Sequence, residues 1–333
     1  QQMFISKAEI CSGYALEYPP LVYYGIHERR GLLPNLKMNL LADGTWTESM
    51  NYNNLVIGML VDALPLMKRA GVDGYTPEVR RFFSDPPKMA SPLGFQPNFG
   101  DGPGVALKAW GGHALLPWMD TKDATIGAVL ARYGGQPLVR WRQMFYLLAY
   151  DGPPPARKEP PEKLGCVDFP DAGYLFLRNA VEDLWLGMAY GRHQGHGHYD
   201  RLGFELVGQG ALQSVDNGGG YDKDHIFDVS ALAHNTILVD MRNHRPGSGR
   251  KLFWETSGPV KLASVGSREL AGGVWMERNI ALFDGAVLLV DGLQSNEEHT
   301  YDWAYHNIGS IASGPKMAPA QPLASDGIYG YLK

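Results

Sequence analysis

The chain has 333 residues, of which 44% are hydrophobic and 20% charged. That size and composition are typical of a globular protein of about two domains. Its 30 basic and 35 acidic residues give a net charge of −5, which argues against a nucleic-acid groove or a lipid-binding basic face. No apolar run reaches the length of a membrane span, about 18 residues. The two cysteines, Cys11 and Cys166, are too few for a disulfide scaffold.

The first half of the chain has helical patterning. Apolar residues recur at a helical period over residues 50–70, where Pro65 is expected to end or kink the helix. Residues 122–133 and 138–149 are two further predicted helices. A loop rich in glycine and proline spans residues 84–104, and a loop this long inside a compact domain is usually functional.

A proline-rich segment at residues 151–165 predicts an extended, semi-rigid linker. We therefore expect a helical domain over residues 1–150 and a β domain over 166–333 that is incomplete at its C-terminus. Short runs rich in β-branched and aromatic residues, separated by Gly, Asn or Asp, predict an antiparallel sheet or sandwich. These runs cover residues 173–179, 183–191, 202–208, 211–216, 235–240, 251–256, 260–266, 275–283, 286–293 and 301–307.

Histidines cluster in the predicted β domain. His196 and His198 would share one face of a strand. Asp216 follows His198 after eighteen residues and His234 follows after eighteen more. Imidazole and carboxylate ligands together suit Zn²⁺, so His198, Asp216 and His234 are candidate zinc ligands. The alternative is a set of hydrogen-bonded histidines at the rim of a sheet.

Two neighbours of this cluster also have two interpretations. Asp200 and Arg201 would either orient a ligand imidazole or form an ordinary ion pair at a strand edge.

Several motifs together resemble the heparinase II/III-like polysaccharide lyases. HGHYDRLGFEL at 196–206, the aspartate of QSVDNGGG at 213–220 and AHNTILVD at 233–240 resemble that family's central β domain. LLADGTWTESMNYNNLVIGML at 40–60 and QPNFGDGPG at 96–104 resemble segments of its helical part. Within the group, the chain most resembles the oligoalginate lyases of polysaccharide lyase families 15 and 17. The resemblance implies an α+β multidomain fold, with the C-terminal part of an (α/α) toroid followed by a large antiparallel β-sheet or sandwich domain.

The resemblance also implies roles for individual residues. Tyr52 matches the catalytic tyrosine and His196 the active-site histidine of the β domain. His198, Asp216 and His234 match the ligands of a zinc ion that is structural in the family. Further candidate substrate-binding residues are Glu48, Asn51, His193, Tyr199, Tyr221 and His306. Helix capping is the alternative for Asn51, core packing is the alternative for Tyr199 and Tyr221, and Glu48 would brace the tyrosine segment.

The chain departs from the family's pattern at two points, which concern the catalytic residues and the substrate. The family carries an Asn-His pair upstream of the tyrosine, and no such pair precedes Tyr52. Its place would be at or before residue 1, so a missing N-terminal segment of the same protein is an expected partner. The alginate-specific enzymes have an arginine near the position of Tyr221, and a longer segment before AHNT. This difference weakens the assignment to alginate and leaves that to lyases intact.

The expected reaction is β-elimination in a uronic-acid-containing glycan. The C5 proton, α to the carboxylate, is removed and the C4 oxygen leaves, which requires stabilisation of the developing negative charge. A phenol such as Tyr52 can take the proton and then protonate the leaving oxygen, assisted by His196 across the interdomain cleft. We expect an acidic polysaccharide or oligosaccharide substrate and a periplasmic or secreted location. No nucleic-acid or membrane partner is expected, and a homodimer stays open.

Three alternatives remain open. A glycosaminoglycan lyase of heparin or heparan type would have the same fold. A cupin-like metal protein would have a glutamate separated from the second histidine by three or four residues, whereas Leu202 and Gly203 stand there and Glu205 is too far. A noncatalytic carbohydrate-binding module or an inactive lyase fragment is the third.

Overall fold

The computed structural model describes residues 2–102, 104–133, 164–179, 184–192, 195–219, 225–309 and 328–329. The chain divides into two compact units. One contains residues 1–48, 52–88 and 105–162, and the other contains 49–51, 89–104 and 163–333. Residues 49–51 and 89–104, expected in the helical domain, thus group with the β unit. None of the described helices is both long and apolar enough to cross a lipid bilayer.

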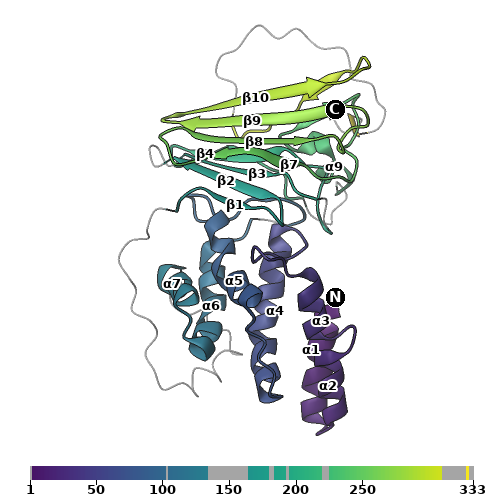
Figure 1. Cartoon of the computed structure of the whole chain (residues 1–333), viewed down its shortest axis with the longest axis vertical. Helices are drawn as coiled ribbons and strands as arrows, with labels where there is room; N and C mark the ends of the chain where they lie inside the picture. Colours follow the sequence, from purple (N-terminus) through teal and green to yellow (C-terminus); the bar gives the residue numbers. More distant parts are fainter. Residues whose placement is uncertain are drawn as a thin grey trace. The chain divides into compact units, whose positions relative to one another are not determined.

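The first unit is built of helices that pair with their neighbours in the chain (Figure 1). α1 contacts α2, and α6 contacts α7. Their buried faces form one core that includes Ile10, Ile26, Ile57, Phe82 and Trp110. The helices are α1 (Gln2–Ala15), α2 (Pro19–His27), α3 (Leu32–Asn39), α4 (Met50–Arg69), α5 (Pro77–Ser84), α6 (Leu107–Thr121) and α7 (Ala124–Tyr133), with a 3₁₀ turn, η1, at Pro86–Met89.

The helix predictions are confirmed for the described residues, with one correction. α4 covers the predicted 50–70 segment, and α7 lies within 122–133. Of the two outcomes expected at Pro65, an end of the helix is wrong, because α4 continues to Arg69; a kink stays a prediction. Ala63, Leu64 and Met67 are buried around it, and that burial offsets the roughly 3 kcal/mol that an internal proline costs. The helix expected at 138–149 and most of the linker at 151–165 lie outside the described residues.

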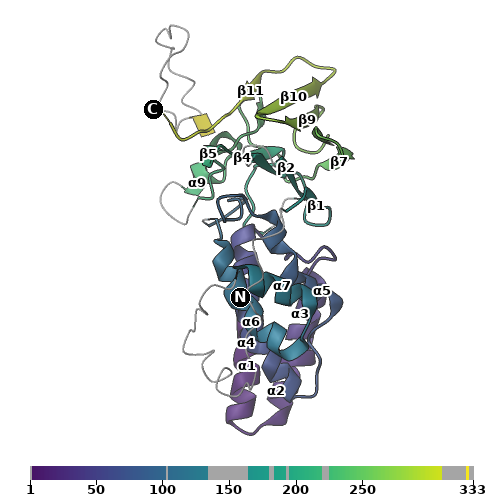
Figure 2. The ribbon, with the colours of Figure 1, turned by 90° about the vertical axis from the view of Figure 1, so that its left-hand side faces the viewer.

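The second unit contains antiparallel sheets (Figure 2). β1 to β5 form a meander in chain order, β7 to β10 form a second sheet, and β6 pairs with β11. β2 faces β8 and β9, so the inward side chains of the two sheets form one core, as in a sandwich. The strands are β1 (Val167–Phe169), β2 (Tyr174–Asn179), β3 (Leu184–Ala189), β4 (Gly203–Gly208), β5 (Ala211–Ser214), β6 (Ile237–Val239), β7 (Arg250–Glu255), β8 (Lys261–Ser267), β9 (Trp275–Phe283), β10 (Ala286–Gln294) and β11 (Tyr301–Trp303).

Every strand expected from the sequence is present, and the antiparallel prediction is confirmed. β9 shows the reason most clearly, because its residues alternate between buried and half-buried along its whole length. β1 was not predicted, since three residues carry too little periodicity. Between β5 and β6 lie a short helix, α9 (His225–Asp228), and a 3₁₀ turn, η3 (Ala231–Ala233).

Candidate functional site

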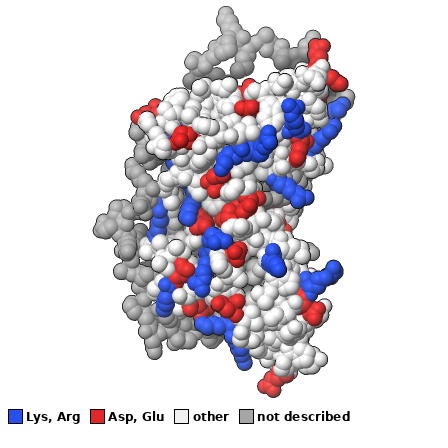
Figure 3. Space-filling view, in the orientation of Figure 1, with Lys and Arg blue, Asp and Glu red and all other residues white. Residues whose placement is uncertain are grey.

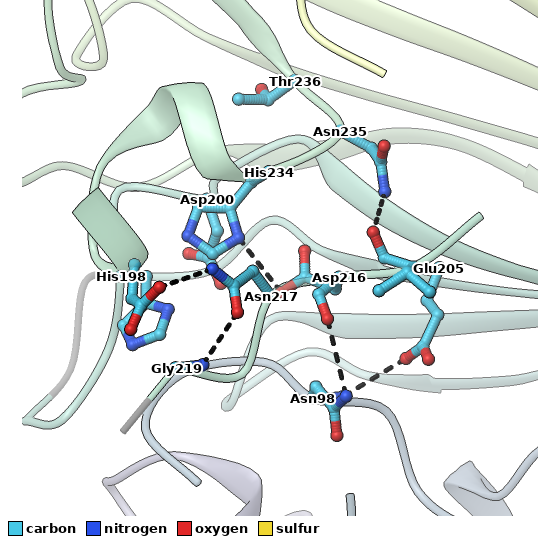
Figure 4. Close-up of polar contacts among 12 residues, drawn as sticks. Asn98, His198, Asp200, Glu205, Asp216, Asn217, Gly219, His234, Asn235 and Thr236 are labelled. Carbon is cyan, nitrogen blue, oxygen red and sulfur yellow. Dashed lines mark hydrogen bonds and ion pairs between the residues drawn. The ribbon is translucent and has the colours of Figure 1, made fainter. Parts of the chain in front are cut away.

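Loops of the β unit bring the predicted metal ligands together in one buried cluster (Figure 4). His198 lies between β3 and β4, Asp216 follows β5, and His234 lies between η3 and β6. All three side chains are fully buried. The start of β4 and the end of β5 lie together because these strands are paired and antiparallel, and the loop before β6 adds His234, 36 positions after His198, from a different sheet.

The contacts within the cluster are short. His234 Nδ1 is 3.1 Å from Asp216 Oδ1, and the His198 and His234 rings lie 5.1 Å apart, centroid to centroid. Burial opposes a charge on His234, but the Asp216 carboxylate raises the pKa of that imidazole. This proximity of opposite charges stabilises the pair inside the domain.

The donor chemistry of the cluster suits zinc. Asp216 Oδ2 and His234 Nε2 are buried and have no hydrogen-bond partner among the described residues, which would let them bind a cation. Those residues nevertheless contain no group of three or more His, Cys, Asp or Glu side chains arranged to hold a metal ion. Zinc binding by His198, Asp216 and His234 therefore stays a prediction.

Asp200 and Arg201 form a buried ion pair beside this cluster. Arg201 Nη1 lies 2.8 Å from Asp200 Oδ1, and neither side chain is more than 4% exposed. Burial works against the charge of Asp200, but Arg201, His234 and His198 together lower the pKa of the carboxyl. Of the two alternatives for this pair, an ordinary ion pair at a strand edge does not fit its burial, and a role in orienting a ligand imidazole stays a prediction.

His196 differs from His198 in both exposure and backbone. His196 is exposed and His198 is fully buried. The segment is a turn, not a strand, and His196 has a left-handed conformation with φ of 58°. The expectation that the two histidines share a strand face is therefore wrong, because the left-handed residue breaks the alternation. Such a conformation is uncommon outside glycine and is often found at functional sites.

A loop at residues 98–102 fastens the histidine segment to the turn after β5. The Asp101 amide donates to the His196 carbonyl at 2.8 Å, and the Gly102 amide donates to Gly218 at 2.7 Å. Gly100 has φ of 85°, and a Cβ there would lie 2.5 Å from the His196 oxygen. Only glycine therefore allows this close backbone approach.

A second carboxylic acid is buried next to this loop. Glu205 on β4 accepts a hydrogen bond from the main-chain amide of Asn98 at 3.2 Å. Burial, and then the nearby Asp216 carboxylate, raise the pKa of Glu205 to about 8. A carboxyl with so high a pKa can hold a proton near neutral pH.

Asn235 of the AHNT motif and Arg278 stabilise the loops of the cluster through hydrogen bonds to main-chain carbonyls. Asn235 Nδ2 donates to the carbonyls of Phe204 and Val215 at 2.9 and 2.7 Å. The fully buried Arg278 donates to the carbonyls of Leu202 and Asn235 and pairs with Asp291 through two bonds. These contacts link β9 and β10 to the loops that carry the histidines.

The other candidate residues lie in various settings. Tyr52, in the first turn of α4, and Glu48 are half-buried and belong to the helical unit, whereas the half-buried Asn51 groups with the β unit. Tyr199 is half-buried, and its amide donates to Val229. His306 donates its amide to Asn235, and its ring lies 2.8 Å from the Leu232 carbonyl. His193 and Tyr221 lie outside the described residues.

Sequence reasoning missed Asp101, Glu205 and Arg278 as site residues. Asp101 and Glu205 lie in the motifs PNFGD and HGHYDRLGFEL, and these motifs are the one signal that could have found them. Nothing in the local sequence around Arg278 marks it, because its partners are 43 and 76 residues away.

Comparison with known proteins decides the family of the β unit. Residues 162–321 match the family described as heparinase II/III-like, C-terminal. This region is a heparinase II/III-like C-terminal domain. No curated protein sequence matches the chain.

Solved structures extend the similarity to the fold of the helical unit. Two structures titled heparinase III share 17% identity with the chain at TM-scores of 0.73 and 0.71, and cover 94% and 92% of it. The heparan sulfate lyase HepC from Pedobacter heparinus shares 17% identity over 88% of the chain at a TM-score of 0.62. The chain spans 48%, 49% and 45% of those structures, respectively. The fold is thus that of a heparinase III-type polysaccharide lyase, over about half the length of these structures.

Proposed function

We propose that the chain belongs to a polysaccharide lyase that cleaves a uronic-acid-containing glycan by β-elimination, leaving a 4,5-unsaturated uronate. The observation that carries this proposal is His196. It is exposed and left-handed, and it lies beside a buried histidine–aspartate cluster in a heparinase II/III-like domain. An exposed, backbone-fixed imidazole is suited to contact a substrate, while the buried cluster holds its loop in place.

Two residues would handle protons in this proposal. Tyr52 would take the C5 proton and return a proton to the C4 oxygen as the C4–O bond breaks. His196 would stabilise the negative charge that develops on the uronate as the C5–H bond breaks. Glu48, Asn51, Tyr199 and His306 remain proposed substrate contacts, although the amide, the carbonyl and the ring of His306 all bind within the β unit.

Two substrates are supported by different observations. The overall order of the sequence motifs resembles the oligoalginate lyases and favours alginate or its oligosaccharides, although the short segment before AHNT weakens that assignment. The solved structures favour a glycosaminoglycan, since the titles name heparinase III and a heparan sulfate lyase. Acidic and basic side chains are interspersed on the face of the protein in Figure 3, so the visible charge pattern does not separate the two polyanions.

Zinc and location complete the proposal. His198, Asp216 and His234 would hold a zinc ion that supplies a structural crosslink among three loops of the β unit. Lyases that degrade external polysaccharides act outside the cytoplasm, so a periplasmic or secreted location follows from the proposed substrate.

The test is the ultraviolet absorbance of the new double bond, measured with the intact natural protein on alginate, heparan sulfate, hyaluronan and glucuronan. We expect product with at least one of them, and its loss in Tyr52→Phe and His196→Ala. Tyr23→Phe and His27→Ala are controls, because both side chains are exposed on α2. Absence of product with every uronan would refute the lyase function and leave the noncatalytic binding module.

A further inference from the structure

Asp101 contacts the histidine segment at two points. Its main-chain amide donates to the His196 carbonyl at 2.8 Å. Its carboxylate oxygen Oδ1 lies 2.9 Å from Nε2 of His198. Both side chains of the latter pair are nearly or fully buried, at 7% and 0% exposure. One residue thus holds the backbone of the exposed histidine and the ring of the buried one.

The carboxylate determines which nitrogen of His198 carries the proton. An ionised carboxylate only accepts hydrogen bonds, so it requires N–H at Nε2. In the neutral imidazole, Nδ1 is then the acceptor nitrogen. A carboxylate behind a histidine commonly fixes both the tautomer and the ring orientation.

The loop that carries Asp101 is held independently of its side chain. Gly102 donates its amide to Gly218 and Gly219 at 2.7 and 3.1 Å, and Ser49 Oγ donates to the Asp101 carbonyl at 3.2 Å. Asn98 is bound by Glu205. Removal of the carboxylate should therefore leave the loop in place and remove directly only the hydrogen bond to His198, so that any effect on His196 passes through the His198 ring.

We propose that Asp101 is a positioning residue: it selects the Nε2–H tautomer of His198 and holds His196 in its left-handed conformation. His198 and His196 are separated by one glycine, so a fixed ring at one position restrains the backbone of the other. The catalytic consequence rests on the lyase function proposed above, whereas the tautomer itself does not.

The test is nitrogen NMR of the full chain labelled with ¹⁵N-histidine, recorded at pH 8 with a chelator so that no metal contributes. His198→Gln identifies the His198 signals by their disappearance. We expect a protonated Nε2 and an unprotonated Nδ1 in the wild type. Asp101→Ala should shift His198 to a mixture of tautomers, and Asp101→Asn to an intermediate mixture, since an amide can accept from or donate to Nε2.

A matched control is available in the same unit. Asp240 Oδ2 lies 2.8 Å from Nδ1 of His299, but this pair is at the surface. Asp240→Asn should leave the His198 signals unchanged. A protonated Nδ1 of His198 in the wild type, or unchanged His198 signals in Asp101→Ala, would overturn the proposal. The wild-type spectrum alone decides the first point, even where a variant fails to fold.

Kinetics add a readout that separates this proposal from the lyase function. In an active enzyme, Asp101→Ala should lower kcat by about tenfold or more and change KM less, because misplaced groups lose transition-state contacts more than binding. An unchanged kcat with altered tautomer would remove the catalytic consequence. Absence of wild-type activity would refute the lyase function and leave the NMR result to decide the role of Asp101.

Discussion

Glu205 makes the stability of the β unit depend on pH, and Glu205→Gln should remove that dependence. The carboxyl is buried on β4 and accepts a hydrogen bond from the main-chain amide of Asn98. Burial raises its pKa from 4.5 to about 8. Glutamine has nearly the same shape, keeps an acceptor for Asn98 and does not titrate, so the variant isolates the ionisation.

The sign and size follow from linkage. Below pH 4.5 the carboxyl is neutral in both the folded and unfolded states, so the folded state loses nothing. As pH rises towards 8, the unfolded chain ionises first and the folded state becomes relatively less stable. The gap between 4.5 and about 8 corresponds to an upper limit of about 5 kcal/mol. Relative to the wild type, Glu205→Gln should therefore gain stability between pH 5 and pH 9.

Urea unfolding followed by tryptophan fluorescence at pH 5, 7 and 9 measures this difference. Glu277→Gln is the matched control, because Glu277 lies on β9, is only half-buried and binds Ser264 and Trp275. Its difference from the wild type should change little with pH. If the difference between the wild type and Glu205→Gln were the same at pH 5 and pH 9, the assignment of a neutral, buried Glu205 would be refuted.

Three further predictions concern the support of the site. Gly94 and Gly100 both have a left-handed φ, but only at Gly100 would a Cβ meet the His196 carbonyl. In thermal unfolding, Gly94→Ala should thus lower the free energy of unfolding by about 1 kcal/mol, and Gly100→Ala should lower it clearly more. Equal losses for the two variants would contradict the close approach of Gly100 to the His196 carbonyl. Arg278→Met leaves the half-buried Asp291 carboxylate and two carbonyls without their donor, and should lower the free energy of unfolding in urea by about 3 kcal/mol. A loss below about 1 kcal/mol would contradict it. Elemental analysis of protein purified without chelator should find one zinc per chain, lost in His234→Ala, and metal-free wild-type protein would exclude the site.

The elements of the fold could be predicted because their signals are local. The apolar spacing of α4 and the alternation of β9 are both readable within the segment itself. Pro65 shows the limit of that reasoning. Its local preference is to end a helix, and the buried residues around it decide otherwise.

The candidate site was predictable in its donors and not in its geometry. The spacing of His198, Asp216 and His234 identified the buried cluster, because each follows or precedes a recognisable strand. Its partner Asp101 is 97 residues from His198 in the chain. The left-handed conformation of His196 also depends on contacts that form only in the folded unit, so strand periodicity placed both histidines on one face.

The arrangement of these contacts explains how a loop can hold a strained residue. A left-handed residue other than glycine costs about 1–2 kcal/mol, so the surrounding structure must outweigh that cost. Asp101 binds the His196 carbonyl from one side. From the other side, Arg278 holds the carbonyls of Leu202 and Asn235, beyond the ends of the histidine loops. Substitution of Arg278 should therefore disturb His196 without contacting substrate. Substitution of Asp101 should do so through the ring of His198, because the main-chain hydrogen bond to the His196 carbonyl remains.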